Sequence, residues 1–337
     1  MLVSVFMLTF TSDFVNNRHG IMKKLLATIC MIAMTAAGMA QSEVYFTKEI
    51  TPEALVKIYK ALGREASGRV AVKISTGEDG GNNYLKPTLI RKLVEEVNGT
   101  IVECCTAYPG KRLTPEDHWN TIHKHGFDSI AAVDIMDEYG IIRIPVKDKK
   151  HLKYDIVGSH LPNYDFMINL AHFKGHAMGG FGGVLKNASI GVASTAGKTY
   201  IHTAGKATEH TQLFQNLPEQ DHFLESMAAA AQGVHEYFDG GKRILYINVM
   251  NNLSVDCDCD SHPADPQMKD VGILASLDPV ALDKACLDLV FGHTDAKGDD
   301  SKPLQERINR QHGTYIVDYA EQIGLGTRKY KLVNIDK

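Results

Sequence analysis

Short apolar runs alternate along the chain with segments in which apolar residues recur every three or four positions. The apolar runs predict strands, and they lie at 69–74, 100–105, 129–136, 165–170, 243–249 and 271–275. The helical spacing predicts helices at 51–62, 88–98, 114–125, 221–238, 278–290, 303–311 and 315–323. This alternation is typical of an α/β fold, in which helices cover both faces of a mostly parallel sheet.

Four further segments complete the predicted fold. Gly140–Val146 and Leu152–Gly158 favour a hairpin or small subdomain appended to the sheet, and Lys329–Ile335 alternates like an edge strand. The apolar run Leu185–Val192 predicts a continuation of the strand before it. Since the sequence contains no internal repeat or linker, we expect residues 41–337 to form a single domain.

The first forty residues have the pattern of a targeting segment. A basic start at Met22–Lys24 precedes the apolar stretch Leu25–Ala37 and a small-residue cleavage site at Gly38–Ala40. We interpret residues 1–40 as an upstream extension followed by a signal peptide. The sequence therefore predicts an exported protein, periplasmic or extracellular, that begins at Gln41. No other apolar segment is long enough to span a membrane.

Composition excludes some classes of function. The chain has a formal net charge of −4, and a mildly acidic protein is a poor candidate for nucleic acid or for anionic membranes. Beyond residue 40 the cysteines are odd in number, and two pairs are too close in sequence for unstrained disulfides. These pairs are Cys104 with Cys105 and Cys257 with Cys259, and Cys286 reads as a small buried residue.

The most unusual stretch of the sequence is Ala171–Ser194, which contains two histidines, two lysines and six glycines. His172 and His176 are four residues apart and are candidate metal ligands. Because the glycines disfavour a helix, we expect a loop at the end of a strand, where open α/β sheets bind ligands. The alternative is a pair of surface histidines in a loop.

The glycines and lysines of this stretch predict an anion-binding loop. Glycine lets backbone N–H groups approach a ligand, and lysine adds positive charge. The candidate residues are Lys174, Gly179, Gly180, Gly182, Gly183, Lys186 and Asn187. Since a lysine beside flexible glycines has few packing partners, we expect Lys174 and Lys186 to serve ligand binding more than folding. The alternative for several glycines is tight turns, and no nucleotide-binding fingerprint is present.

The sequence Cys257-Asp258-Cys259 is a second candidate site. Thiolates bind zinc and other borderline metal ions, and Asp270 is an additional or alternative ligand. One Cys-x-Cys is half of an ordinary metal site, so we expect it to meet His172 and His176 from a neighbouring parallel strand. Together they would suit a zinc or iron ion. The alternatives are two free thiols in a loop, or a cluster with local carboxylates only.

The residues resemble those of the domain-of-unknown-function family numbered 362 (DUF362), whose members are described as uncharacterised iron–sulfur centre proteins. The matching motifs are HFKGH at 172–176, GFGGVLKN at 180–187, CDC at 257–259 and DVGILASLDPVALD at 270–283. Many members carry a cysteine-rich, ferredoxin-like insertion before the Cys-Asp-Cys. This chain has no cysteine between Ser194 and Asp256, so a 4Fe-4S cluster, which needs four ligands, is not expected here.

The resemblance supplies no reaction, because the activity of the family is not established. We therefore expect an exported metal-binding protein, either a metal-dependent or a redox-related enzyme that acts on a small anionic substrate. The alternative is a non-catalytic protein that binds a small anion and whose Cys-Asp-Cys loop is structural. In both hypotheses the partner is a small anion.

Overall fold

The computed structural model describes residues 41–336, which are built around an eight-stranded sheet with the order β12-β1-β11-β10-β7-β2-β3-β4. The strands are β1 (Ser42–Thr47), β2 (Val70–Lys73), β3 (Thr100–Glu103), β4 (Val133–Ile135), β7 (Phe166–His172), β10 (Ile244–Met250), β11 (Gly272–Ser276) and β12 (Tyr330–Asn334). Only β11 among these strands runs against the others. The predicted mostly parallel α/β fold is confirmed.

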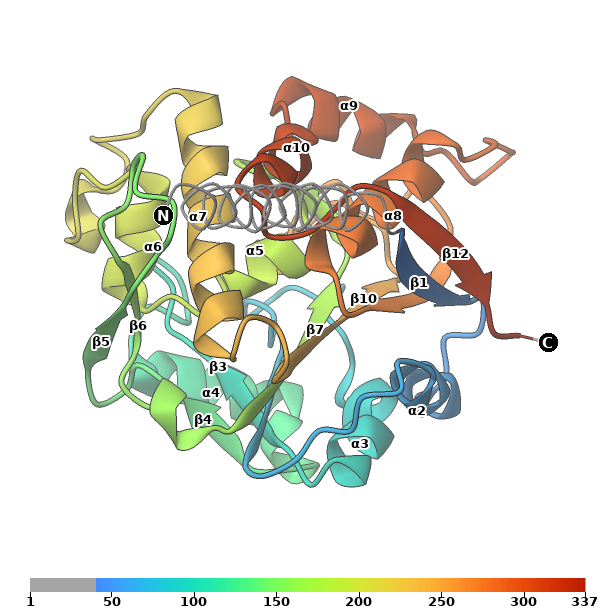
Figure 1. Cartoon of the computed structure of the whole chain (residues 1–337), viewed down its shortest axis with the longest axis horizontal. Coiled ribbons are helices and arrows are strands. Elements are labelled where there is room, and N and C mark those ends of the chain that lie inside the picture. The colour runs from blue at the N-terminus through green and yellow to red at the C-terminus, as the bar shows by residue number, and fades with distance from the viewer. Residues whose placement is uncertain (1–40, 337) are drawn as a thin grey trace, which may run out of the picture. The chain divides into compact units, whose positions relative to one another are not determined.

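Helices cover both faces of the sheet (Figure 1). One face carries α2 (Pro52–Ala61), α3 (Pro87–Glu96) and α4 (Pro115–His125). The other side carries α5 (Val184–Ala188), α6 (Thr195–His202), α7 (Gln220–Tyr237), α8 (Pro279–Phe291), α9 (Lys302–Arg310) and α10 (Tyr315–Gln322). Each face has its own hydrophobic core. Short 3-10 turns lie at Phe127–Ser129, Leu161–Asn163 and His210–Gln212.

Two helix starts predicted from sequence are confirmed by their caps. The Thr114 hydroxyl accepts a hydrogen bond from the Asp117 amide at 3.2 Å, and Asp278 accepts one from the Val280 amide at 2.9 Å. A proline follows each cap, where its missing N–H costs nothing. Caps of this kind stabilise a helix by about 1 kcal/mol.

The central strands β7 and β10 are buried along their whole length because helices lie on both sides. Each contains one buried asparagine. Asn169 donates to the Val184 carbonyl at 3.0 Å, and Asn248 donates to Asp283 at 2.7 Å. These hydrogen bonds tie α5 and α8 to the middle of the sheet.

One predicted strand is wrong. The run 185–192 begins as the helix α5, because Asp283 accepts hydrogen bonds from the amides of Val184 and Leu185, both at 2.9 Å. Gly183 leaves room for this carboxylate, since a Cβ there would lie 2.3 Å from Asp283 Oδ1. Burial raises the pKa of Asp283 to about 6. Asp283 is therefore buried away from solvent and holds α5 in place.

The predicted hairpin is present as β5 (Ile141–Ile144) paired antiparallel with β6 (Asp155–Gly158). The proposed signal peptide and upstream extension lie outside the described residues. Within residues 41–336, none of the helices combines the length and apolar character that a membrane span requires.

The order of the strands defines a switch point. From β2 the chain moves outward to β3 and β4, and then returns to the other side of β2 as β7. The connections after β2 and β7 therefore leave the sheet in opposite directions. At such a point the carboxyl ends of two parallel strands border a crevice, the usual ligand site of open α/β sheets.

Candidate metal and anion-binding site

The two conspicuous stretches of the sequence meet at this switch point. Strands β7 and β10 are parallel neighbours, so the loops that follow them leave the same edge of the sheet. After β7 the chain forms a small hairpin of β8 (Lys174–His176) and β9 (Gly180–Gly182). The predicted loop is thus a hairpin. Its Gly175 donates to the Ser254 carbonyl at 2.8 Å, which places the Cys-Asp-Cys loop directly against it.

Glycine is required at this crossing. A Cβ on Gly175 would lie 2.1 Å from the carbonyl oxygen of Val255, far inside contact distance. The two backbones can therefore approach only because this position has no side chain.

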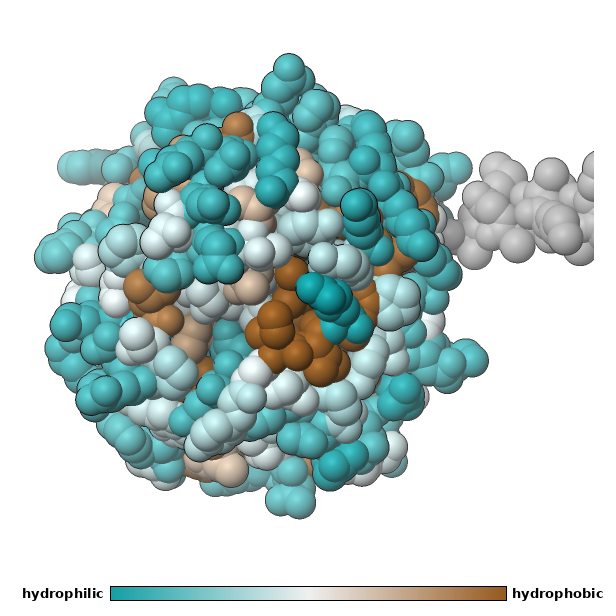
Figure 2. All heavy atoms as spheres, turned by 90° about the vertical axis from the view of Figure 1, so that its left-hand side faces the viewer, coloured by the Kyte–Doolittle hydropathy of each residue, from teal (hydrophilic) through white to brown (hydrophobic). Residues whose placement is uncertain are grey.

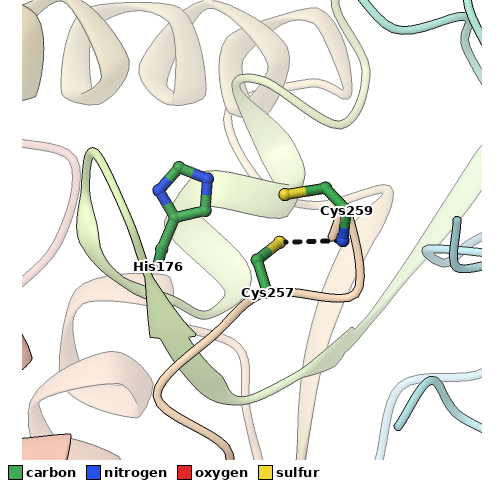
Figure 3. A group of neighbouring side chains, drawn as sticks. All are labelled: His176, Cys257 and Cys259. Carbon is green, nitrogen blue, oxygen red and sulfur yellow. Dashed lines mark hydrogen bonds between the residues drawn. The ribbon is translucent and has the colours of Figure 1, made fainter. Parts of the chain in front are cut away.

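His176, Cys257 and Cys259 converge at the crossing. Their potential ligand atoms all lie within 4.8 Å of one another (Figure 3). His176 and Cys257 are buried, and Cys259 is partly exposed. The structure therefore brings together one imidazole and two thiols from the predicted set of ligands.

The orientation of the His176 ring is fixed by backbone amides. Its Nδ1 accepts hydrogen bonds from Met178 at 3.2 Å and from Gly179 at 2.8 Å. Burial lowers the pKa of His176 well below its usual value, so the ring is neutral. Because Nδ1 accepts, the proton of the neutral ring lies on Nε2. Figure 3 shows the ring nitrogen opposite Nδ1 turned toward the two cysteines.

His172 does not join this cluster, contrary to the expectation from spacing. Its Nδ1 bonds to Asp258 at 2.8 Å, and its Nε2 contacts the Asn251 carbonyl at 2.5 Å. Both ring nitrogens are therefore occupied, and neither is free for a metal ion. His172 instead supports the middle residue of the Cys-Asp-Cys loop.

Lys174 also has a structural partner, contrary to the sequence-based expectation. It is buried and forms an ion pair with Asp258 at 2.8 Å. Burial alone would lower the pKa of Lys174, but Asp258 outweighs this and raises it. Burial alone would raise the pKa of Asp258, yet His172 and Lys174 lower it. The buried pair is therefore ionised and holds the loop against the hairpin.

Asp270 lies outside the cluster. Its carboxylate accepts a hydrogen bond from the Asn252 amide at 2.8 Å and is exposed at the far end of the loop. Asn252 has a positive φ of 46°, a conformation that asparagine tolerates better than most residues. Asp270 thus stabilises the turn after β10 and is not placed to share a metal ion with the cysteines.

The two thiols interact with each other and with lysine. The backbone N–H of Cys259 donates to Cys257 Sγ at 3.4 Å (Figure 3), and Lys186 Nζ lies 3.4 Å from the same sulfur. Cys259, Lys186 and Lys174 lower the pKa of Cys257, whereas Cys257 and burial raise the pKa of Cys259. Cys257 therefore loses its proton more easily than an ordinary thiol, which favours a bound cation or a reactive thiolate.

The cluster forms one wall of a pocket rich in basic side chains. The basic residues that line it are Lys73, Arg112, Lys174, Lys186 and Lys198. Three of them are neutralised: Lys73 by Glu103 at 2.8 Å, Arg112 by Glu78 at 3.3 Å, and Lys174 by Asp258. Lys186 and Lys198 have no carboxylate partner among residues 41–336.

Lys198 is the more unusual of these two lysines. It is buried, and its Nζ donates to the carbonyls of Ala193 at 2.5 Å and Cys104 at 3.5 Å. An ammonium group has three protons, so one remains for a ligand in the pocket. A buried cation without a carboxylate in direct contact is costly. A bound anion would offset that cost.

Several predicted anion-binding residues have different roles. Gly182, Gly183 and Asn187 line the pocket, whereas Gly179 and Gly180 do not. Gly180 has a φ of +80° and packs on Gly313, where a Cβ would lie 2.8 Å from the Gly313 Cα. Gly180 is therefore needed for a turn.

Asn187 contributes to the pocket by holding a lysine. It donates to the Lys73 carbonyl at 3.0 Å, and its Oδ1 accepts from Lys73 Nζ at 3.3 Å. The Asn187 side chain thereby fixes both the end of β2 and the ammonium group of Lys73.

The sequence analysis did not identify Lys73, Glu103, Arg112, Lys198 and His202 as residues of the pocket. A signal existed for the first two, since each is a charged residue at the end of an otherwise apolar strand. Burial would raise the pKa of Glu103, but Lys73 and Arg112 outweigh it and the pKa falls to about 2. Lys198 and His202 gave no signal, because no α6 helix was predicted.

A second, more open pocket adjoins this one. The two share Tyr108, His176, His202, Cys257 and Cys259. The outer pocket also includes Phe214, which is 61% exposed. The thiols therefore lie between a basic interior and a partly apolar opening.

Fold and site together define an α/β protein with a cysteine–histidine cluster and a basic pocket at the switch point of its sheet. Residues 70–288 match the family model described as "Domain of unknown function (DUF362)". The match covers more than half of the chain, and the protein belongs to this family. No curated protein matches the sequence.

Two solved structures show weak similarity. The lactate racemase apoprotein from Thermoanaerobacterium thermosaccharolyticum has 13% identity and a TM-score of 0.36, over 62% of this chain and 50% of that one. A structural genomics target from Thermotoga maritima has 12% identity and a TM-score of 0.38, over 82% of this chain and 59% of that one. The chain thus spans between half and three-fifths of the length of these proteins.

Proposed function

We propose that the switch-point pocket is the active site of a metal-dependent enzyme that acts on a small anionic substrate. In this proposal, His176, Cys257 and Cys259 hold one zinc or iron ion. The observation that carries it is the convergence of three potential ligand atoms within 4.8 Å on the wall of a pocket that also holds Lys186 and Lys198.

The set of donors suits such an ion. Zinc is bound by cysteine and histidine, and catalytic zinc sites keep three protein ligands and one open position. A bound ion would act as a Lewis acid on a carboxylate or phosphate oxygen. The cluster offers two cysteines and one histidine, whereas a 4Fe-4S cluster needs four ligands, usually cysteines.

The remaining pocket residues would bind and orient the substrate. Lys186 and Lys198 would neutralise its negative charge. His202 is a candidate proton acceptor, because its Nδ1 donates to the Lys198 carbonyl at 2.7 Å and leaves Nε2 unprotonated in the neutral ring. Burial lowers the pKa of His202 to about 4, which keeps that ring neutral at physiological pH.

A second candidate function is binding of an anion without a metal ion. It is favoured by His176, whose Nδ1 accepts two amide hydrogen bonds. In most metal sites the second nitrogen of the histidine donates instead. Here an ion would have to displace the proton from Nε2. In this alternative the cysteines and His176 would be structural, and the lysines would carry the function.

Metal analysis of the purified protein separates the two functions. The metal-dependent enzyme should contain one equivalent of zinc or iron that is lost in Cys257→Ser and Cys259→Ser. Cys286→Ser, a change at a buried cysteine outside the pocket, is the matched control and should keep the metal. A metal-free protein whose melting temperature rises with phosphate or small carboxylates would support the second function instead.

We also propose that the protein is exported, on the sequence pattern of residues 22–40. Mass spectrometry of the protein from its natural host should then give a chain that begins at Gln41. A mature chain that retains Met22–Ala40 would overturn this proposal.

A further inference from the structure

A second group of potential metal ligands lies apart from the pocket. The ligand atoms of His151, His222 and Glu225 are within 4.8 Å of one another, and none of the three residues lines the pocket. His151 belongs to the loop between β5 and β6, while His222 and Glu225 are on α7. Residues three apart on a helix share a face, so both α7 side chains can turn toward the loop.

We infer that these three residues form a second binding site for a divalent cation, and zinc is the ion that fits them best. Two imidazoles and one carboxylate are an established set of zinc ligands. The site lies on the α7 and β5–β6 side of the molecule. Figure 2 shows this side, where a largely hydrophilic surface surrounds a compact hydrophobic patch.

The carboxylate of Glu225 is already oriented. It is buried, and its Oε1 accepts from the Tyr315 hydroxyl at 2.8 Å and from Lys150 Nζ at 2.7 Å. Its Oε2 lies 2.5 Å from His151 Nε2. In metal sites the ligating carboxylates are themselves held by hydrogen bonds of this kind. Oε2 is bonded to His151 alone, so an ion would take the place of the proton between these two groups.

The position of His222 distinguishes a metal site from a simple ion pair. An ion pair between His151 and Glu225 would suffice to join the loop to the helix. His222 takes no part in that pair: its Nε2 lies 3.9 Å from the exposed Glu219, and its ring lies 4.7 Å from the ring of His151, at 40°. Two imidazoles beside one carboxylate are the arrangement that a shared cation would require.

Lys150 is the competing cation at this carboxylate. Its side chain is 50% exposed, so it can move into solvent when a metal ion binds. In the absence of metal, Lys150 neutralises part of the negative charge of Glu225. We therefore expect removal of Lys150 to strengthen metal binding.

A bound ion would link the loop, α7 and, through Tyr315, α10. It would also stabilise one wall of the pocket. The carbonyl of His151 packs against Gly205, where a Cβ would lie 2.3 Å away, and Gly205 follows the helix α6 that carries Lys198 and His202. The site is thus a structural clamp next to the pocket and holds no residue of it.

Zinc stoichiometry tests this inference. In isothermal titration of the metal-free protein with zinc chloride, His222→Ala should bind one equivalent of zinc fewer than the wild type. His222 is half exposed. His210→Ala, at an exposed histidine, is the matched control and should lose none. Lys150→Ala should lower the dissociation constant of the same equivalent about tenfold.

The design keeps this site separate from the cysteine cluster. In Cys257→Ser with Cys259→Ser, the equivalent that depends on His222 should remain. If the cysteine cluster does not bind zinc, the wild type should bind one equivalent of zinc, and His222→Ala should still lose it. If His222→Ala binds as much zinc as the wild type, with unchanged affinity and circular dichroism, the inference is wrong.

Discussion

At the scale of single residues, the site depends on buried charges whose partners are distant in the sequence. Asp258 stands between two cysteines and pairs with both His172 and Lys174. Spacing alone suggested that His172 binds a metal ion and that Lys174 binds a ligand. Neither assignment could be tested from the sequence, because the partner of both lies more than eighty positions away.

Lys174 and Lys186 should therefore respond differently to the same substitution. Lys174→Met leaves the buried Asp258 without its ammonium partner, and breaking a buried pair in this way costs about 3–5 kcal/mol. Lys186→Met removes no carboxylate contact and should change the free energy of unfolding by less than about 1 kcal/mol. Denaturant unfolding of both variants measures this. Equal losses of stability would contradict the roles assigned here.

Asp155 should make stability depend on pH. It is fully buried, and burial raises its pKa to about 7. A carboxyl group whose pKa is higher in the folded protein stabilises the fold at low pH, and this contribution is lost as pH rises from about 4 to about 7. The shift corresponds to roughly 4 kcal/mol.

The variant Asp155→Asn cannot ionise and should flatten this dependence. Unfolding free energies at pH 4.5 and pH 7.5 provide the comparison. The wild type should lose stability relative to the variant between the two values. A difference between wild type and variant that is the same at both pH values would exclude Asp155 as the cause.

At the scale of elements, most strands and helices followed from apolar periodicity and from caps, but β1, β8, β9 and α6 were not predicted. The expected meeting of the two motif loops required β7 and β10 to be parallel neighbours, an order that the sequence left open and that the structure shows. The helix α5 was missed because its start is capped by Asp283, a residue almost a hundred positions away. A short apolar run does not reveal whether such a distant cap exists.

The crossing of the two loops gives a prediction for this scale. Gly175→Ala would place a Cβ 2.1 Å from the Val255 carbonyl and should push the cysteine loop away from β8. Gly182→Ala in the paired strand β9 meets its nearest neighbour, Lys186 Cδ, at 3.4 Å, an ordinary contact. Titration with zinc should show binding to the cysteines weakened at least tenfold in the first variant and little changed in the second. Equal affinities would mean that the crossing does not position the cluster.

At the scale of the whole described domain, the site follows from the order of the strands. From β2 the chain adds strands outward as β3 and β4 and then returns to the other side of β2 as β7. This order brings Lys73, the hairpin and the cysteine loop to one crevice. The sequence predicted a site at this edge of the sheet. It did not predict the basic interior, which comes from charged residues at strand ends and from α6. The convergence of those residues can be predicted only when the strand order is known.

The central claim is that Cys257, Cys259 and His176 bind one metal ion together. X-ray absorption spectroscopy at the zinc edge, on His222→Ala protein loaded with one equivalent of zinc, tests it most directly. The account predicts two sulfur ligands at about 2.3 Å and one nitrogen at about 2.0–2.1 Å, with the remaining position filled by oxygen. A zinc shell without sulfur, or a protein that retains no zinc, would contradict it.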